Sequence, residues 1–117
     1  MTDFAKHWVD AWNSHDLDKI LNHYSEDIEF TSPLVVKVVN DPTGIVRGKE
    51  ALRQYWAKGL ALNPNLHFEI ISVCHGVGGS LSIVYKSVSM NKIVTEIFWF
   101  DDSTANLVIK AMAFYSQ

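Results

Sequence analysis

The sequence has one cysteine, no long apolar run and no excess of basic residues. A single cysteine, Cys74, cannot form an internal disulfide, and the opening MTDFAKHWVD is neither a signal peptide nor a targeting helix, so we expect a cytoplasmic location. The apolar runs are too short to span a bilayer, which predicts no membrane partner. Ten Lys and Arg against thirteen Asp and Glu give a net charge of -3 without basic blocks, so nucleic acid is not an expected partner.

The residue types that commonly bind metal ions do not occur at the spacing of a metal site. The five histidines include no pair at i, i+4 spacing with a third ligand nearby, so we expect no metal site and no other cofactor. Cys74 has no evident histidine partner, and this is more typical of a small core residue than of a nucleophile.

The N-terminal half is expected to be mainly helical. A first helix carries Trp8 and Trp12 on one face and ends near residues 13–14. Asp16 is typical of the N-cap of a second helix, whose apolar stripe includes Tyr24 and which is expected to end around Ser25. A third helix follows Gly48, carries Trp56 on its apolar stripe, and closes before Asn63.

The remaining segments are expected to be strands and turns. Residues 28–32 alternate apolar and polar side chains up to Pro33, which predicts a short strand. Residues 33–48 contain LVVKVV and the turn sequence NDPTG, and we interpret them as a hairpin or an elaborated loop. Four further strands are predicted with connections too short for crossover helices, so they should pair antiparallel; they span 66–74, 81–90, 92–100 and 107–116. The length of 117 residues supports one domain over residues 1–117, of the α+β class.

One strand, VTEIFWFDD, combines a carboxylate with two apolar faces. Glu96 shares one face with Phe98, whereas Ile97 and Trp99 lie on the other. An unpaired buried carboxylate is costly, so Glu96 must reach water, have a partner or take part in chemistry. The second apolar face predicts a homodimer through Ile97 and Trp99; the alternative is a solitary surface tryptophan.

Several segments in order resemble one known family. WVDAWNSHDLDKILNHYSEDIEFTSP, GIVRGKEALRQYWAKGL and TEIFWFDD are similar to the nuclear transport factor 2-like superfamily, within it the SnoaL-like and ketosteroid isomerase-like branch. The resemblance implies a cone-shaped α+β fold, in which a curved mixed or antiparallel sheet wraps around three N-terminal helices and encloses an interior pocket. It also implies pairing through the outer sheet face, in agreement with Ile97 and Trp99.

This sequence keeps only some of the residue types that the isomerases have at their catalytic positions. Ser32 stands where the isomerases have the aspartate that moves the substrate proton, and a serine is not a base near neutral pH without help. Trp8 stands where they have a tyrosine, and its indole donates a hydrogen bond but gives up no proton. Glu96 stands at the place of their third polar residue, a carboxylic acid held protonated by an apolar pocket. Steroid isomerisation by that mechanism is therefore not expected.

Two classes of function remain. The first is a pocket that binds a hydrophobic small molecule, polycyclic or carbonyl-bearing, without the usual isomerase catalytic set. The alternative is a small isomerase, cyclase or hydrolase in which Glu96 is the catalytic acid or base. The expected ligand-binding residues are Trp8, Trp12, Tyr24, Ser32, Trp56 and Phe98. Against this, the aromatic residues could be plain core, and Glu96 could be a structural carboxylate bonded to a neighbouring strand or to Lys86 or Lys110.

Overall fold

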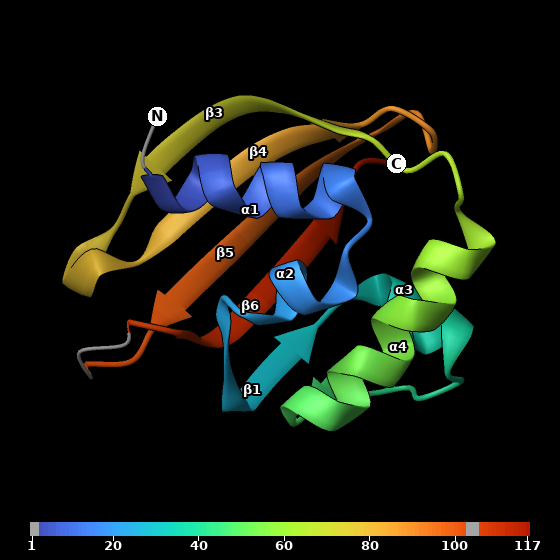
Figure 1. Cartoon of the computed structure of the whole chain (residues 1–117), viewed down its shortest axis with the longest axis horizontal. Coiled ribbons are helices and arrows are strands. Elements are labelled where there is room, and N and C mark those ends of the chain that lie inside the picture. Colours follow the sequence, from blue (N-terminus) through green and yellow to red (C-terminus); the bar gives the residue numbers. More distant parts are fainter. Residues whose placement is uncertain (1–2, 103–105) are drawn as a thin grey trace.

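A curved six-stranded sheet carries helices along its concave side (Figure 1). The computed structural model of the chain describes residues 3–102 and 106–117. The elements in chain order are α1 (Asp3–Ser14), α2 (Leu17–Leu21), β1 (Tyr24–Thr31), α3 (Pro33–Val38), β2 (Ile45–Arg47), α4 (Lys49–Leu62), β3 (Phe68–His75), the 3-10 turn η1 (Val77–Gly79), β4 (Leu81–Ser87), β5 (Lys92–Phe100) and β6 (Val108–Tyr115). Within the described ranges, no helix is long and apolar enough to cross a membrane.

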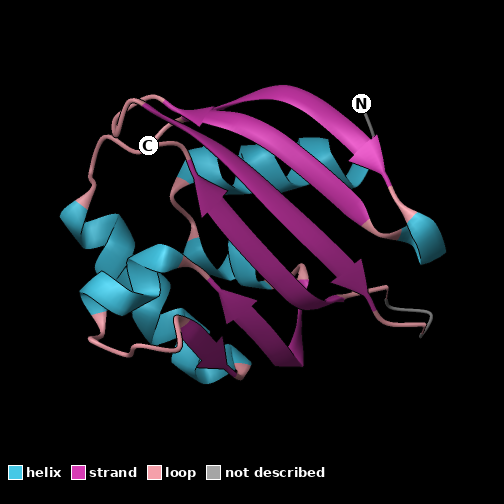
Figure 2. Cartoon of the chain, turned by 180° about the vertical axis from the view of Figure 1, so that it is seen from behind, coloured by secondary structure: helices cyan, strands magenta, loops and turns pink. Residues whose placement is uncertain are grey.

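The sheet is mixed, with the strand order β2-β1-β6-β5-β4-β3. Strands β3 to β6 form the antiparallel series that the short connections predict. Strand β1 pairs antiparallel with the short β2 but parallel with β6, which brings the N-terminal half beside the last strand. Figure 2 shows the opposite face of the sheet, with α1 behind it. Part of the predicted turn before the last strand, residues 103–105, lies outside the described residues.

The second helix is shorter than predicted. Its N-cap is Asp16, as expected, because the Oδ1 atom accepts hydrogen bonds from the backbone N–H groups of Asp18 and Lys19 at 3.1 and 3.2 Å. The helix ends at Leu21, and Tyr24 begins β1 instead of continuing the helix. The His23 carbonyl accepts a 2.9 Å hydrogen bond from the Val108 N–H, so pairing with β6 replaces the next helical turn.

Residues 33–48 hold a further helix where a hairpin or loop was expected. Ser32 caps α3 by accepting a 3.2 Å hydrogen bond from the Leu34 N–H, and Pro33 occupies the first turn, where its fixed φ suits a helix. This capping overrides the strand preference of the valine-rich segment. The predicted turn is present, with Gly44 at a φ of 69°. The described residues therefore hold one short α-helix more than the three that were predicted.

Asn13 fastens the end of α1 to the start of β3. Its Nδ2 donates to the Phe68 carbonyl at 3.0 Å, and its Oδ1 accepts from the Phe68 N–H at 2.8 Å. Both backbone groups at the start of the strand are thereby satisfied by one side chain. The ring centroids of Trp12 and Phe68 consequently lie 5.6 Å apart, and this pair forms one wall of the interior.

Candidate functional site

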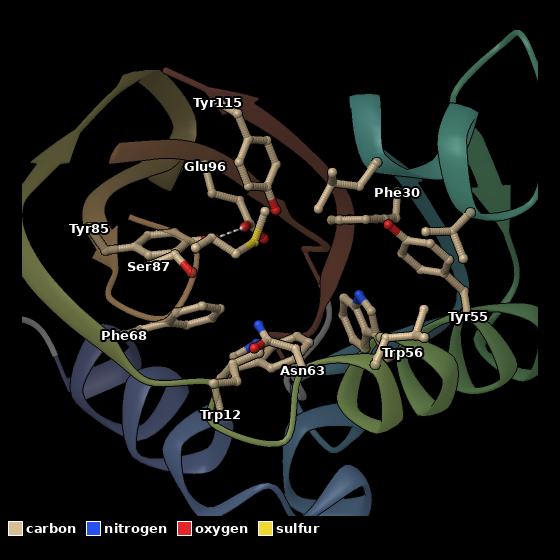
Figure 3. A pocket seen from close by; sticks show the side chains of 16 residues that line it. Trp12, Phe30, Tyr55, Trp56, Asn63, Phe68, Tyr85, Ser87, Glu96 and Tyr115 are labelled. Carbon is tan, nitrogen blue, oxygen red and sulfur yellow. Dashed lines mark hydrogen bonds between the residues drawn. The ribbon is translucent and has the colours of Figure 1, made fainter. Parts of the chain in front are cut away.

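A cavity of about 340 Å³ lies between the concave face of the sheet and helices α3 and α4 (Figure 3). This volume is at the lower end of the roughly 300–1,000 Å³ typical of small-molecule sites. Sixteen described residues line it, most of them aromatic or aliphatic, and Glu96 is the only charged residue among the sixteen. Figure 3 shows two facing walls, one with Tyr85 and Phe68, the other with Phe30 and Trp56.

Glu96 reaches the cavity because β5 alternates its side chains between the two sheet faces. Its neighbours across the ladder are Ile83 and Ala113, and its exposed fraction is 4%. Its Oε1 accepts a 3.0 Å hydrogen bond from the Tyr85 hydroxyl, while no other described residue donates a hydrogen bond to this carboxyl. The partner is therefore a tyrosine on the neighbouring strand.

The lysine partners considered for Glu96 lie elsewhere. Lys86 is paired with Ile93, and Lys110 is paired with Trp99. Both positions are one residue out of phase with the inward face, so these side chains extend from the outer face of the sheet. Lys110 Nζ instead lies 5.2 Å from the centroid of the Trp99 ring.

Burial raises the pKa of Glu96 from its usual 4.5 to about 7, because the charged form loses its hydration. The Tyr85 hydrogen bond favours the ionised form and opposes this rise. A carboxyl with this pKa is present in both protonation states near neutral pH. It can therefore give or accept a proton there, which is what general acid–base chemistry requires.

Two further tyrosines line the cavity, Tyr115 beside Glu96 and Tyr55 next to Phe30 on the facing wall (Figure 3). Burial raises the pKa of Tyr55 to about 12, and it raises the pKa of Tyr115 well above its usual value. The charge of Glu96 adds to both rises, while hydrogen bonding with Ser32 lowers the pKa of both tyrosines. Both phenols are thus neutral at physiological pH and available as hydrogen-bond donors.

The predicted site residues fall into two groups. Trp12, Trp56 and Glu96 line the cavity together. Ser32 is buried beside it, where it caps α3 and supports the two tyrosines rather than facing the cavity.

The other three predicted residues, Trp8, Tyr24 and Phe98, belong to the core beneath the cavity and are outside its lining. Trp8 Nε1 donates a 3.0 Å hydrogen bond to the Tyr24 hydroxyl, so these two polar groups satisfy each other. The Trp8 ring also lies 5.1 Å from that of Tyr85 and 5.5 Å from that of Phe98, between centroids. The Trp8 ring therefore packs against Tyr85 from the core and supports the cavity wall to which Tyr85 belongs.

Sequence reasoning did not identify Phe68, Tyr85, Ser87 and Tyr115 as lining residues. Tyr85 and Ser87 carry one detectable signal, since they alternate with Lys86 on β4 and so share a face. The strand register that brings Tyr85 beside Glu96 is not visible in the sequence. No group of three or more His, Cys, Asp or Glu side chains is arranged to hold a metal ion among the residues that the structure describes.

The chain matches one family of known proteins along nearly its whole length. The family described as SnoaL-like domain matches residues 5–115. A SnoaL-like protein from Burkholderia thailandensis is 40% identical, with 97% of this chain and 92% of that chain covered and a TM-score of 0.90. The chain belongs to the SnoaL-like domain family. The family resemblance and the fold predicted from the sequence are therefore confirmed.

More distant structures share the SnoaL-like fold. A putative polyketide cyclase from Sinorhizobium meliloti has a TM-score of 0.75 at 14% identity, covering 97% of this chain and 95% of that chain. A putative ketosteroid isomerase from Kribbella flavida has a TM-score of 0.65 at 11% identity, covering 97% and 75%. At such identities the likeness is one of fold. No curated protein matches this SnoaL-like chain.

Proposed function

We propose that this SnoaL-like domain binds a small, mostly apolar ligand in the cavity, with Glu96 as a polar anchor. The observation that carries the proposal is the placement of one carboxyl group, with an oxygen free of partners among the described residues, in an otherwise uncharged aromatic cavity. A buried carboxyl in such a place destabilises the fold relative to an apolar side chain. Residues that reduce stability in this way are expected at functional sites.

The lining determines the kind of ligand. Facing aromatic walls suit a flat ring system, which stacks on or packs edge-on against them. At one end of the cavity Tyr115 and protonated Glu96 supply donors, and ionised Glu96 also accepts, so the ligand carries a carbonyl or hydroxyl oxygen at this end. A hydrophobic, carbonyl-bearing or hydroxylated ring compound satisfies both requirements.

Binding of 2-naphthol, measured by titration calorimetry, tests this function. We expect Glu96→Gln to change the affinity by roughly tenfold to a hundredfold, since a hydrogen bond to a charged or partly charged group is altered. Below about pH 4.5 the melting temperature should remain nearly the same, because Glu96 is protonated there and the carboxamide preserves its shape and can still accept from Tyr85. A large loss of stability without any change in affinity would assign Glu96 to structure alone.

A second candidate function is proton transfer on such a ligand, favoured by the Glu96 pKa of about 7. In this reading Glu96 removes a proton from carbon beside a carbonyl while neutral tyrosines donate to the carbonyl oxygen. Ser32 does not replace the isomerase aspartate, because it is buried outside the lining. Exchange of deuterium from solvent into 2-tetralone separates turnover from binding: catalysed exchange that Glu96→Gln abolishes supports an enzyme, whereas binding without exchange supports a binding protein.

We also propose a homodimer through the outer face of the sheet. Phe114 and Ile93 are 49% and 39% exposed there, and Phe114 is beside Thr95 on the face that includes Ile97 and Trp99. Neighbouring exposed apolar side chains on one face favour association with a matching surface. The oligomeric state in solution tests this proposal.

The location of the protein in a reducing cytoplasm remains part of the proposal. Cys74 was expected to lie in the core, but it is exposed on β3 as a free thiol. Sheet alternation near the β3 irregularity determines this orientation, which local sequence does not reveal. An exposed free thiol is more stable in a reducing compartment than in an oxidising one, and this supports the proposed location.

A further inference from the structure

Two buried polar atoms lack a hydrogen-bond partner in the described part of the chain, and both belong to residues that line the cavity. They are Trp12 Nε1 and Ser87 Oγ. Trp12 is 7% exposed and Ser87 is 1% exposed. Native proteins leave few buried polar groups unsatisfied, so the occurrence of two in one lining requires an explanation. The Tyr85 hydroxyl does not provide it, since it donates to Oε1 of Glu96.

The two atoms belong to the part of the lining next to Phe68. Ser87 is the cross-strand neighbour of Phe68 in the β3–β4 pair, and Trp12 contacts the Phe68 ring. The Asn13 side chain holds the Phe68 backbone through two hydrogen bonds. The Phe68 ring lies 4.6 Å from the Tyr85 ring, between centroids, and the Tyr85 hydroxyl reaches Glu96. Along the β4–β5 pair Ser87 is opposite Lys92, four residues from Glu96, and the Phe68 and Tyr85 rings continue from Trp12 toward the carboxyl. Figure 3 shows Glu96 and Tyr115 at one end of the cavity and Trp12 with Asn63 at the other.

We propose that Trp12 and Ser87 form a second polar subsite, which binds an acceptor oxygen at the end of the ligand opposite to Glu96. This inference rests on the proposed binding function and makes it more specific. An indole N–H only donates, and a serine hydroxyl can donate beside it, so the group that they bind is an acceptor. None of the sixteen lining residues is Lys, Arg or His, so the oxygen is neutral rather than part of a carboxylate or phosphate.

The ligand class follows from the two ends together. It is a neutral ring compound, apolar along the wall of Phe68 and Tyr85, with an oxygen function at each end. Both subsite atoms are covered by neighbouring side chains, so the oxygen reaches them when a lining side chain turns aside. Met90 lines the cavity and is 38% exposed, and an unbranched methionine changes rotamer at little cost.

A matched pair of probes tests the subsite. Naphthalene-2,6-diol has an oxygen at both ends of the same ring system that carries one oxygen in 2-naphthol. We expect the full-length wild type to bind the diol roughly threefold to tenfold more tightly in titration calorimetry, the range for one added neutral hydrogen bond. Ser87→Ala and Trp12→Phe should each lower the affinity for the diol more than the affinity for 2-naphthol, so that most of this preference is lost.

The test of the subsite has a control variant and defined results that would contradict the proposal. Ser72→Ala removes an exposed hydroxyl from β3 and should retain the full preference for the diol. If the wild type binds both probes equally, or if Ser87→Ala retains the preference, the subsite is overturned and the binding function stands. If the wild type binds neither probe, both proposals are overturned. Should Trp12→Phe fail to fold, Ser87→Ala decides the result, since it removes only a hydroxyl.

Discussion

The Tyr85 hydroxyl donates a 3.0 Å hydrogen bond to Oε1 of Glu96 across the β4–β5 pair. The two residues are diagonal neighbours, because Glu96 is opposite Ile83 and Tyr85 is opposite Val94. One carboxyl oxygen is thereby fixed in position against an aromatic wall. The other has no partner among the described residues, so it is available to a ligand.

The first prediction concerns the pKa of Glu96. We expect NMR titration to give a value of about 7, because the loss of hydration outweighs the Tyr85 hydrogen bond. Tyr85→Phe removes a donor that favours the ionised form, so it should raise this pKa further. A wild-type value near or below 4.5 would show that the carboxyl is hydrated or paired, contrary to the cavity geometry.

The second prediction links this pKa to stability. The folded pKa lies above the unfolded value, so the folded protein binds the extra proton between about pH 4.5 and 7. The contribution of Glu96 to the free energy of unfolding is thus complete below pH 4.5 and is lost as the pH rises through 7. The difference between the two pKa values corresponds to roughly 3 kcal/mol.

Urea unfolding of the wild type and of Glu96→Gln at several pH values measures this loss. The carboxamide does not titrate, and the other ionisable groups are common to both proteins. The stability of the wild type relative to the variant should therefore decrease from pH 4.5 to pH 8. A constant difference over this range would contradict the raised pKa.

The third prediction concerns Ser87 in the absence of ligand. Its hydroxyl is buried without a partner, and such a group costs about 1–3 kcal/mol. Ser87→Ala should consequently increase the free energy of unfolding of the ligand-free protein, by up to about 1 kcal/mol once the lost side-chain contacts are allowed for. Thermal unfolding checks this. A clear decrease in melting temperature would mean that the hydroxyl has a structural partner.

The fourth prediction concerns the outer face of the sheet. Light scattering on a sizing column should give the mass of a dimer at micromolar concentration. Ile97→Lys should shift the protein to a monomer without unfolding it, because a charge on the outer face cannot be buried against a second copy. Val77→Lys is the matched control, as Val77 is 96% exposed in the η1 turn away from this face. A monomeric wild type would end the dimer proposal.

The elements that depend on local periodicity are predictable from the sequence. Helices α1 and α4 and the four C-terminal strands follow from the spacing of apolar side chains, and Asp16 caps the second helix because a short acidic side chain can reach the first free N–H groups. The inward face of β5, with Glu96 and Phe98 buried, also follows from alternation. In these cases each residue interacts mainly with neighbours a few positions away.

Which side chains meet depends on contacts between distant parts of the folded chain. Tyr24 joined β1 because the His23 carbonyl pairs with Val108, an interaction between distant parts of the chain. The register of β4 against β5 placed Tyr85 beside Glu96, and the Asn13 contact with Phe68 fixed the wall next to which Trp12 and Ser87 are left without partners. Strand register and helix docking arise from long-range packing, for which a single sequence carries no local signal. The sequence therefore identified Glu96, and the three-dimensional fold supplied its surroundings.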